Sequence, residues 1–211
     1  MEETVGTRLN GQTAIARDVL QKYLIRVLEI DEESAPFRVV SLEKEKEYRA
    51  KLTISAGLDA KEVALKGIID RVDERAGVIR LIDYKSGGDK KDFPDIPSLF
   101  NRDDTKRNKA AMQTLFYGLI YQATHPQNTA PLKPAIFNLK EIFSDEFDPY
   151  LHLKENRKAG IELNDYRDYE EEYTTGLKGL LEELYNPEVP FSQTEDLNKC
   201  KYCPYKEICG R

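Results

Sequence analysis

The sequence predicts an α/β fold in a single domain spanning residues 1–211. Two β-prone runs, 63–72 and 78–85, are separated by a short polar stretch containing Gly77 and predict a pair of strands. Between 107 and 124, apolar residues recur at three- and four-residue steps, which indicates an amphipathic helix. With 211 residues and 40% hydrophobic content, the chain is long enough to bury one substantial core.

The other segments complete this alternation. The run 37–54 predicts one or two strands, interrupted by a charged stretch at 43–47 that we expect at a solvent-facing edge. Residues 131–139 predict a further strand, and 165–185 predict a late helix that ends before Asn-Pro. A long polar segment, 89–104, predicts a flexible loop close to the functional residues. Thr13–Ile30 predicts an opening helix whose buried side comprises Ala14, Ile15, Val19, Leu20, Tyr23 and Leu24.

Two acidic residues, Asp70 and Asp83, lie within apolar, β-prone sequence. Charged side chains are rare in such positions unless they are paired or bind a metal. If Asp73 pairs with Val78, Asp70 lies opposite Leu81 and diagonal to Asp83, about 7–8 Å away on the same face of the sheet. We therefore expect the two carboxylates to lean toward one shared cation.

The residues after Asp83 extend this expectation. Side chains alternate along a strand, so Asp83 and Lys85 share a face while Tyr84 points away. The two carboxylates and the backbone carbonyl of Tyr84 are oxygen ligands of the kind that Mg²⁺ or Mn²⁺ prefers. A metal there would acidify a water molecule, and a protonated Lys85 would steer that water or stabilise the developing negative charge. This chemistry is that of a phosphodiester-cleaving enzyme.

Three short motifs follow one another in the chain: Gly67-x-x-Asp70-Arg71, Asp83-x-Lys85-Ser86-Gly87 and Gln113-x-x-x-Tyr117. Their order and spacing resemble the motif series of RecB-type nucleases in the PD-(D/E)xK superfamily. The resemblance implies a restriction-endonuclease-like core, with a central mixed β-sheet flanked by helices, and DNA as the substrate. It implies that Asp70 and Asp83 are metal ligands and that Lys85 is the catalytic lysine. It also implies that Gln113 and Tyr117, which lie four residues apart on one side of a helix, help to engage the DNA strand.

Each motif alone also has a simpler interpretation. An aspartate before an arginine is often a turn residue, and the second motif is compatible with a strand that ends in a glycine turn. Tyr117 is compatible with simple core packing, and Gln113 with a water-facing position. We expect Asp73 to be a hairpin residue, and Arg71 to pair with a nearby acid.

All three cysteines lie between residues 200 and 209: Cys200, Cys203 and Cys209. Their spacing is typical of metal ligation. It resembles the C-terminal three-cysteine group of AddB-like nucleases, in which a fourth, upstream cysteine completes a four-iron, four-sulfur (4Fe-4S) cluster. Such a cluster would fasten the tail to an upstream helix.

The fourth cysteine is missing here, which leaves three explanations. The chain is a C-terminal fragment of a larger helicase–nuclease, the group binds zinc or iron through another ligand, or it binds nothing. We favour the fragment. A disulfide is less compatible with the odd cysteine count and the lack of a secretion signal, which favour a reducing, cytoplasmic compartment.

RecB-type nucleases usually carry a further metal-binding His or Glu ahead of the sheet. The two histidines, His125 and His152, follow the motifs, and we expect both to be surface or capping residues. The upstream ligand is therefore either absent from this sequence or replaced by Glu43 or Glu47.

Charge and hydropathy limit the possible partners. A net charge of −6 opposes binding to a polyanion, whereas a basic cluster after Lys85 is compatible either with a DNA contact or with a solvated loop. No apolar run is long enough to span a bilayer, so we expect no membrane association. We expect DNA and a helicase domain or subunit as partners. The basic cluster comprises Lys90, Lys91, Arg102, Lys106, Arg107 and Lys109.

Two functions follow from these observations. The first is a Mg²⁺- or Mn²⁺-dependent deoxyribonuclease, an exonuclease module in double-strand-break repair or recombination. The second is a catalytically inactive domain of the same fold that holds DNA or braces a partner subunit. The intact Asp70, Asp83 and Lys85 favour the first function, and the missing upstream histidine favours the second.

Overall fold

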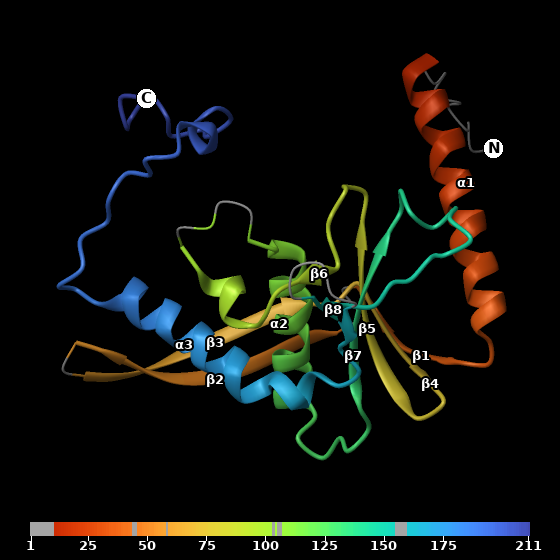
Figure 1. The fold of residues 1–211 in the computed structure, drawn as a ribbon, viewed down its shortest axis with the longest axis horizontal. Coiled ribbons are helices and arrows are strands. Elements are labelled where there is room, and N and C mark those ends of the chain that lie inside the picture. Colours follow the sequence, from red (N-terminus) through yellow and green to blue (C-terminus); the bar gives the residue numbers. More distant parts are fainter. Residues whose placement is uncertain (1–10, 44–45, 58, 103, 105–106, 155–159) are drawn as a thin grey trace, which may run out of the picture.

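The computed structural model describes residues 11–43, 46–57, 59–102, 104, 107–154 and 160–211. Its long helices are α1 (Gly11–Ser34), α2 (Lys109–Thr124) and α3 (Glu170–Tyr185) (Figure 1). The strands are β1 (Arg38–Leu42), β2 (Glu47–Ala56), β3 (Asp59–Ile68), β4 (Arg71–Arg75), β5 (Val78–Lys85), β6 (Asp92–Phe93), β7 (Leu132–Asn138), β8 (His152–Leu153) and β9 (Ile161–Glu162). Short 3₁₀ helices are η2 (Pro97–Phe100), η3 (Tyr166–Tyr169) and η4 (Leu197–Cys200).

A four-stranded sheet with the order β1-β4-β5-β7 forms the centre of the fold. The pair β5–β7 is parallel and the other two pairs are antiparallel, so the sheet is mixed. Parallel neighbours need a long crossover connection, and α2 lies within the segment that joins β5 to β7. The predicted mixed sheet flanked by helices is thereby confirmed.

The β4–β5 hairpin has a different register from the predicted one. Asp73 pairs with Arg80, and Val78 pairs with Arg75, so the predicted pairing of Asp73 with Val78 is wrong. The reason is the turn: Ala76 and Gly77 have φ values of 50° and 79°, and a two-residue turn of this kind is shorter than the predicted loop. Continued by one residue beyond β4, the observed register brings position 70 opposite position 83 rather than opposite Leu81.

The helix α2 packs one face of the sheet and carries much of the core. Its residues Ala111, Leu115 and Ile120 are buried, together with Leu81 and Ile136 of the sheet. The long hairpin β2–β3 forms a separate two-stranded sheet that packs against α2, and α3 lies along this hairpin (Figure 1). The predicted helices at 107–124 and 165–185 and the predicted strands at 37–54 and 131–139 all form, with small shifts of their ends.

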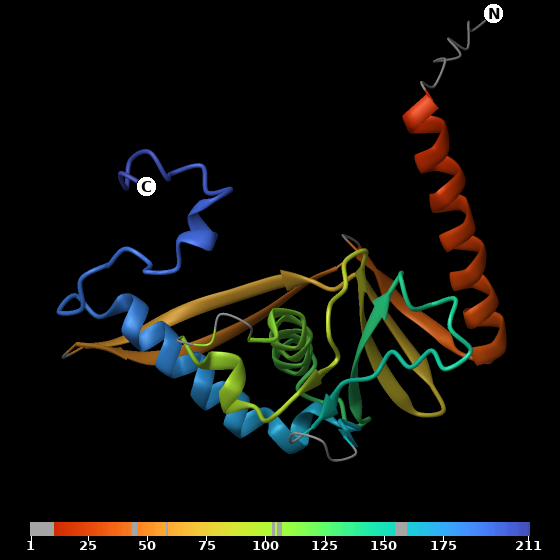
Figure 2. The same cartoon turned by 45° about the horizontal axis from the view of Figure 1, so that its top comes forward.

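The opening helix forms as predicted, but its predicted buried side is wrong. Ile15, Val19, Leu20 and Leu24 are 66%, 42%, 57% and 65% exposed, and the predicted Ala14 and Tyr23 are only half-buried. Only the C-terminal part of α1 meets the sheet, because the helix projects away from the body (Figure 2). There Tyr23, Val27 and Ile30 pack in a second apolar cluster with Ile82, Ala135 and Phe137, on the sheet face opposite α2.

The predicted flexible loop at 89–104 contains regular structure in its described part. It forms the short strand β6 and the 3₁₀ helix η2. Phe93, Ile96 and Leu99 are buried, and the ring of Phe100 packs edge-on against Tyr173 of α3. These apolar residues at three-residue intervals anchor the segment, so its polar composition misled the prediction. Within the described ranges, no helix has the combination of length and apolar character that crossing a membrane requires.

Candidate active site

Three elements bring the predicted site residues together. Asp83 and Lys85 lie two positions apart on β5, and both side chains face α2 as strand alternation predicts. Gln113 and Tyr117 lie one turn apart on α2 and face β5. Asp70 lies between β3 and β4, beside the end of β5.

The four side chains from β5 and α2 form a closed ring of polar contacts. Lys85 Nζ lies 2.8 Å from Asp83 Oδ2 and donates to Gln113 Oε1 at 2.8 Å. Gln113 Nε2 donates to Tyr117 Oη at 2.8 Å, and Tyr117 Oη donates to Asp83 Oδ1 at 3.1 Å. Tyr117 is buried in the core and Gln113 is exposed, as the simpler interpretation expected, yet both also contact the acid and the lysine.

Asp70 approaches the same point from the other side of the hairpin. The backbone N–H of Tyr84 donates to Asp70 Oδ2 at 2.9 Å, which fixes this carboxylate next to position 83. Burial raises the pKa of Asp83, contacts with Lys85 oppose this rise, and the negative charge of Asp70 adds to it. Burial and the charges of Asp83 and Asp70 also raise the pKa of Tyr117, so its phenol remains a hydrogen-bond donor.

A comparison with family models adds independent evidence. The model described as the PD-(D/E)XK nuclease superfamily matches residues 1–210. The chain belongs to this superfamily. A comparison with curated proteins returns no match.

Members of the PD-(D/E)XK superfamily use divalent metals, and the site has features that fit one. Asp83 is 1% exposed, and its Oδ2 lies 2.8 Å from the ammonium of Lys85. Burial and the negative charge of Asp70 both disfavour the ionised form of Asp83, and a divalent cation between the two carboxylates would offset both effects. Asp70 supplies a second carboxylate, and the predicted Tyr84 carbonyl remains a prediction. This donor set suits Mg²⁺ or Mn²⁺.

A buried ionic network supports the hairpin from behind the site. Asp73 is fully buried and accepts hydrogen bonds from Arg71 at 2.8 Å and from Arg80 at 2.5 and 2.9 Å. Arg71 also donates to Asp31 of α1 at 2.7 Å and to the phenol of Tyr84 at 3.3 Å. The predicted pairing of Arg71 with an acid is confirmed, and Asp73 is a residue of the β4–β5 hairpin, as predicted. The sequence signal that could have indicated this buried network is the presence of charged residues within an otherwise apolar hairpin.

The two acids considered as upstream ligands have different surroundings. The carboxylate of Glu47 is paired with Arg49 at 2.6 Å and with Lys66 at 3.6 Å. By contrast, the backbone N–H of Glu43 donates to the carbonyl of Asp70 at 2.8 Å, which places Glu43 beside a predicted metal ligand. The backbone of Glu43 therefore lies next to Asp70, whereas the carboxylate of Glu47 is engaged by two cationic side chains.

The two histidines differ from each other. His125 is the residue that ends α2, as predicted, and its ring stacks on Tyr121 while its Nε2 lies 2.5 Å from Lys46 Nζ. Burial lowers the pKa of His125. His152, predicted to be a simple surface or capping residue, is instead a strand residue of β8, and its ring lies among acidic side chains.

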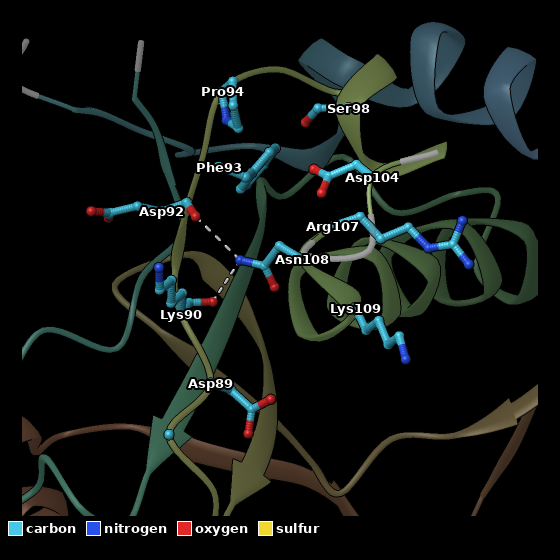
Figure 3. Close-up of a pocket in the computed structure, with 11 residues that line it drawn as sticks. Asp89, Lys90, Asp92, Phe93, Pro94, Ser98, Asp104, Arg107, Asn108 and Lys109 are labelled. Atoms are coloured by element: carbon cyan, nitrogen blue, oxygen red, sulfur yellow. Dashed lines mark hydrogen bonds between the residues drawn. The ribbon is translucent and has the colours of Figure 1, made fainter. Parts of the chain in front are cut away.

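The predicted basic cluster forms part of a pocket that follows Lys85 in the chain (Figure 3). Asn108, which caps α2, donates to the carbonyls of Lys90 and Asp92 and so joins the two walls of this pocket. Within the cluster, Lys91 pairs with Glu141, Arg102 pairs with Glu183, and Lys106 lies outside the described residues. The charged residues that line the pocket are Lys90, Arg107 and Lys109 together with Asp89, Asp92 and Asp104.

The three cysteines are free thiols in the segment after α3. Cys200 and Cys203 are half-buried and Cys209 is exposed. The backbone N–H of Cys203 donates to the carbonyl of Cys200 at 3.1 Å, so the first two cysteines lie on one turn. A metal or iron–sulfur cluster at Cys200, Cys203 and Cys209 remains a prediction.

Proposed function

We propose that this chain is a metal-dependent DNA nuclease that hydrolyses phosphodiester bonds. The observation that carries the proposal is the convergence of Asp70, Asp83 and Lys85 at the end of β5, where Asp83 is buried and lies 2.8 Å from the Lys85 ammonium. Superfamily membership supports the reaction class. The choice of DNA, and of the RecB/AddB-type branch, rests on the motif resemblance.

The residues divide the work between binding and positioning. Asp70 and Asp83 would hold Mg²⁺ or Mn²⁺, which when bound supplies Lewis acidity and an acidified water. Lys85 donates hydrogen bonds to the attacking water or to the phosphate oxygens on which negative charge develops. Gln113 accepts from Lys85 and so fixes the direction of its ammonium group, while Tyr117 fixes the orientation of Asp83.

The net charge of −6 requires that DNA meets a locally favourable surface. Lys90, Arg107 and Lys109 line the pocket next to the end of β5 and the start of α2, and we propose that they contact the phosphate backbone. Their acidic neighbours limit this attraction, so we expect weak binding by the isolated chain. A helicase domain or subunit would then deliver the strand.

The resemblance to RecB- and AddB-type nucleases also suggests a cellular role. We propose an exonuclease module in double-strand-break repair or recombination, acting in the cytoplasm as a C-terminal part of a larger helicase–nuclease. The odd number of cysteines, three, supports a reducing compartment. If a fourth cysteine lies upstream, Cys200, Cys203 and Cys209 would complete a 4Fe-4S cluster.

A catalytically inactive module is the alternative. It is favoured by the positions of the histidines, since His125 ends α2 and His152 lies on β8 instead of completing the site around Asp70. The test is degradation of linear single- and double-stranded DNA with Mn²⁺, comparing the chain with Asp83→Ala and Lys85→Ala. The nuclease proposal predicts activity that both variants lose. Equal degradation by all three proteins would indicate a contaminant, and no degradation by any of them would favour the inactive module.

A further inference from the structure

A second group of metal-ligating side chains surrounds His152. One ligand atom from each of Asp148, His152 and Glu162 lies within 4.8 Å of the others, and His152 Nε2 lies 3.3 Å from Asp148 Oδ2. The group shares no residue with the candidate active site. Among the residues that the structure describes, this is the one place where ligand atoms of at least three His, Cys, Asp or Glu residues lie this close together.

The strand register explains how this group is assembled. His152 of β8 pairs directly with Glu162 of β9 across an antiparallel ladder, so their side chains project from the same face. Asp148 precedes β8, and its backbone carbonyl is held by the ammonium of Lys91 while its Oδ1 accepts the N–H of Tyr150 at 2.9 Å. Three separate backbone positions are thus fixed before any ligand binds.

The neighbouring charges complete the setting. His152 Nδ1, the nitrogen that faces away from Asp148, lies 3.9 Å from Asp92 Oδ1, a position from which a carboxylate can orient a ligating imidazole. Lys133 pairs with Glu162, and its ammonium also lies 3.7 Å from the centre of the Tyr150 ring. Lys133 therefore retains an aromatic partner if a cation takes over the carboxylate of Glu162.

We propose that Asp148, His152 and Glu162 bind one divalent transition-metal ion, with Zn²⁺ as the best match. One imidazole nitrogen and two carboxylate oxygens form a three-residue ligand set with positions left for water, a pattern that Zn²⁺ accepts and that Mg²⁺, which prefers oxygen ligands alone, does not. The ion would join β8, β9 and the Asp148 loop. Because it binds the folded chain, it would also raise the thermal stability.

The test is Zn²⁺ titration of the full chain by calorimetry, with thermal unfolding in parallel. Cys200, Cys203 and Cys209 are changed to Ser and Asp83 to Asn, which removes thiolate binding and the candidate nuclease metal. We expect one bound Zn²⁺ and a raised melting temperature, both lost in His152→Ala and in Glu162→Gln. The matched control is His125→Ala, which removes the other histidine of the chain and should leave Zn²⁺ binding unchanged.

Two results would overturn the site. One is saturable Zn²⁺ binding that His152→Ala and Glu162→Gln both leave unchanged, and the other is no binding by the parent protein. Circular dichroism of each variant without metal separates loss of the site from loss of the fold, and Glu162→Gln keeps the size of the side chain if His152→Ala unfolds. Co²⁺ in place of Zn²⁺ gives an absorption spectrum that reports nitrogen and oxygen ligation independently of activity.

Discussion

Tyr117 of α2 donates a hydrogen bond to Asp83 of β5, with 3.1 Å between Oη and Oδ1. This contact joins the helix to the strand at the point where the acid of the second motif lies. The phenol therefore fixes one oxygen of the carboxylate, while the other oxygen, Oδ2, lies 2.8 Å from the Lys85 ammonium.

We predict that Tyr117→Phe slows DNA cleavage without abolishing it. The substitution removes the hydrogen bond to Asp83 and also the acceptor for Gln113. One such bond contributes about 1 kcal/mol, so we expect a fall in kcat of roughly five- to tenfold. The control is Tyr121→Phe, one turn further along α2 and also buried. An equal fall in both variants, measured by steady-state cleavage, would show that the hydroxyl of Tyr117 has no specific role.

Asp83 should make the metal-free protein less stable as the pH rises. Burial raises its pKa, so the folded chain binds this proton more tightly than the unfolded chain does. Stability therefore falls as the pH rises from about 4, the ordinary aspartate value, through the raised pKa of Asp83. We expect Asp83→Asn to be more stable than the wild type in urea at neutral pH, and this advantage to disappear in acid. The exposed Asp18→Asn serves as control, and lower stability of Asp83→Asn at neutral pH would contradict the prediction.

The Asp73 network should be a major stabilising feature. Asp73→Asn removes the charge that two buried arginines share, and breaking a buried ion pair in this way costs about 3 to 5 kcal/mol. The adjacent Glu74 pairs with Arg38 at a more exposed position, so Glu74→Gln should cost less than about 1 kcal/mol. Urea unfolding of both variants measures the difference. Similar losses in the two variants would mean that burial of the network does not set its contribution.

Two glycines of α3 provide a matched test of packing. A Cβ at Gly176 would lie 2.4 Å from Cδ2 of Phe100, whereas a Cβ at Gly179 meets nothing within 4 Å. Gly176→Ala should therefore destabilise the protein by about 1–3 kcal/mol through overpacking. Gly179→Ala should stabilise it by about 0.5–1 kcal/mol, because alanine favours helix. Equal effects in thermal unfolding would show that Phe100 moves aside without cost.

Local periodicity accounts for the parts of the site that the sequence predicted. Alternation along a strand places Asp83 and Lys85 on one face, and a four-residue step places Gln113 and Tyr117 on one side of a helix. These rules depend only on positions close in the chain. They predict each pair but not the contact between the two pairs, which the packing of α2 against β5 provides.

The wrong predictions depended on distant contacts or on turn geometry. The exposed face of α1 resembles a core-facing helix in sequence, but only its last turns reach the sheet. The partners of Asp73 became clear only with the hairpin register, which the turn at Ala76 and Gly77 sets. Likewise, His152 meets Glu162 through a two-residue strand pair that no periodicity indicates.

The central claim is that Asp70 and Asp83 hold one divalent cation between them. Mn²⁺ binding, followed by the decrease of the free-ion electron paramagnetic resonance signal, tests it most directly. The protein should carry His152→Ala and serine at the three cysteines, so that other candidate ligands are removed. We predict one bound Mn²⁺ that is lost in both Asp70→Asn and Asp83→Asn. Undiminished Mn²⁺ binding in either variant would contradict the shared site.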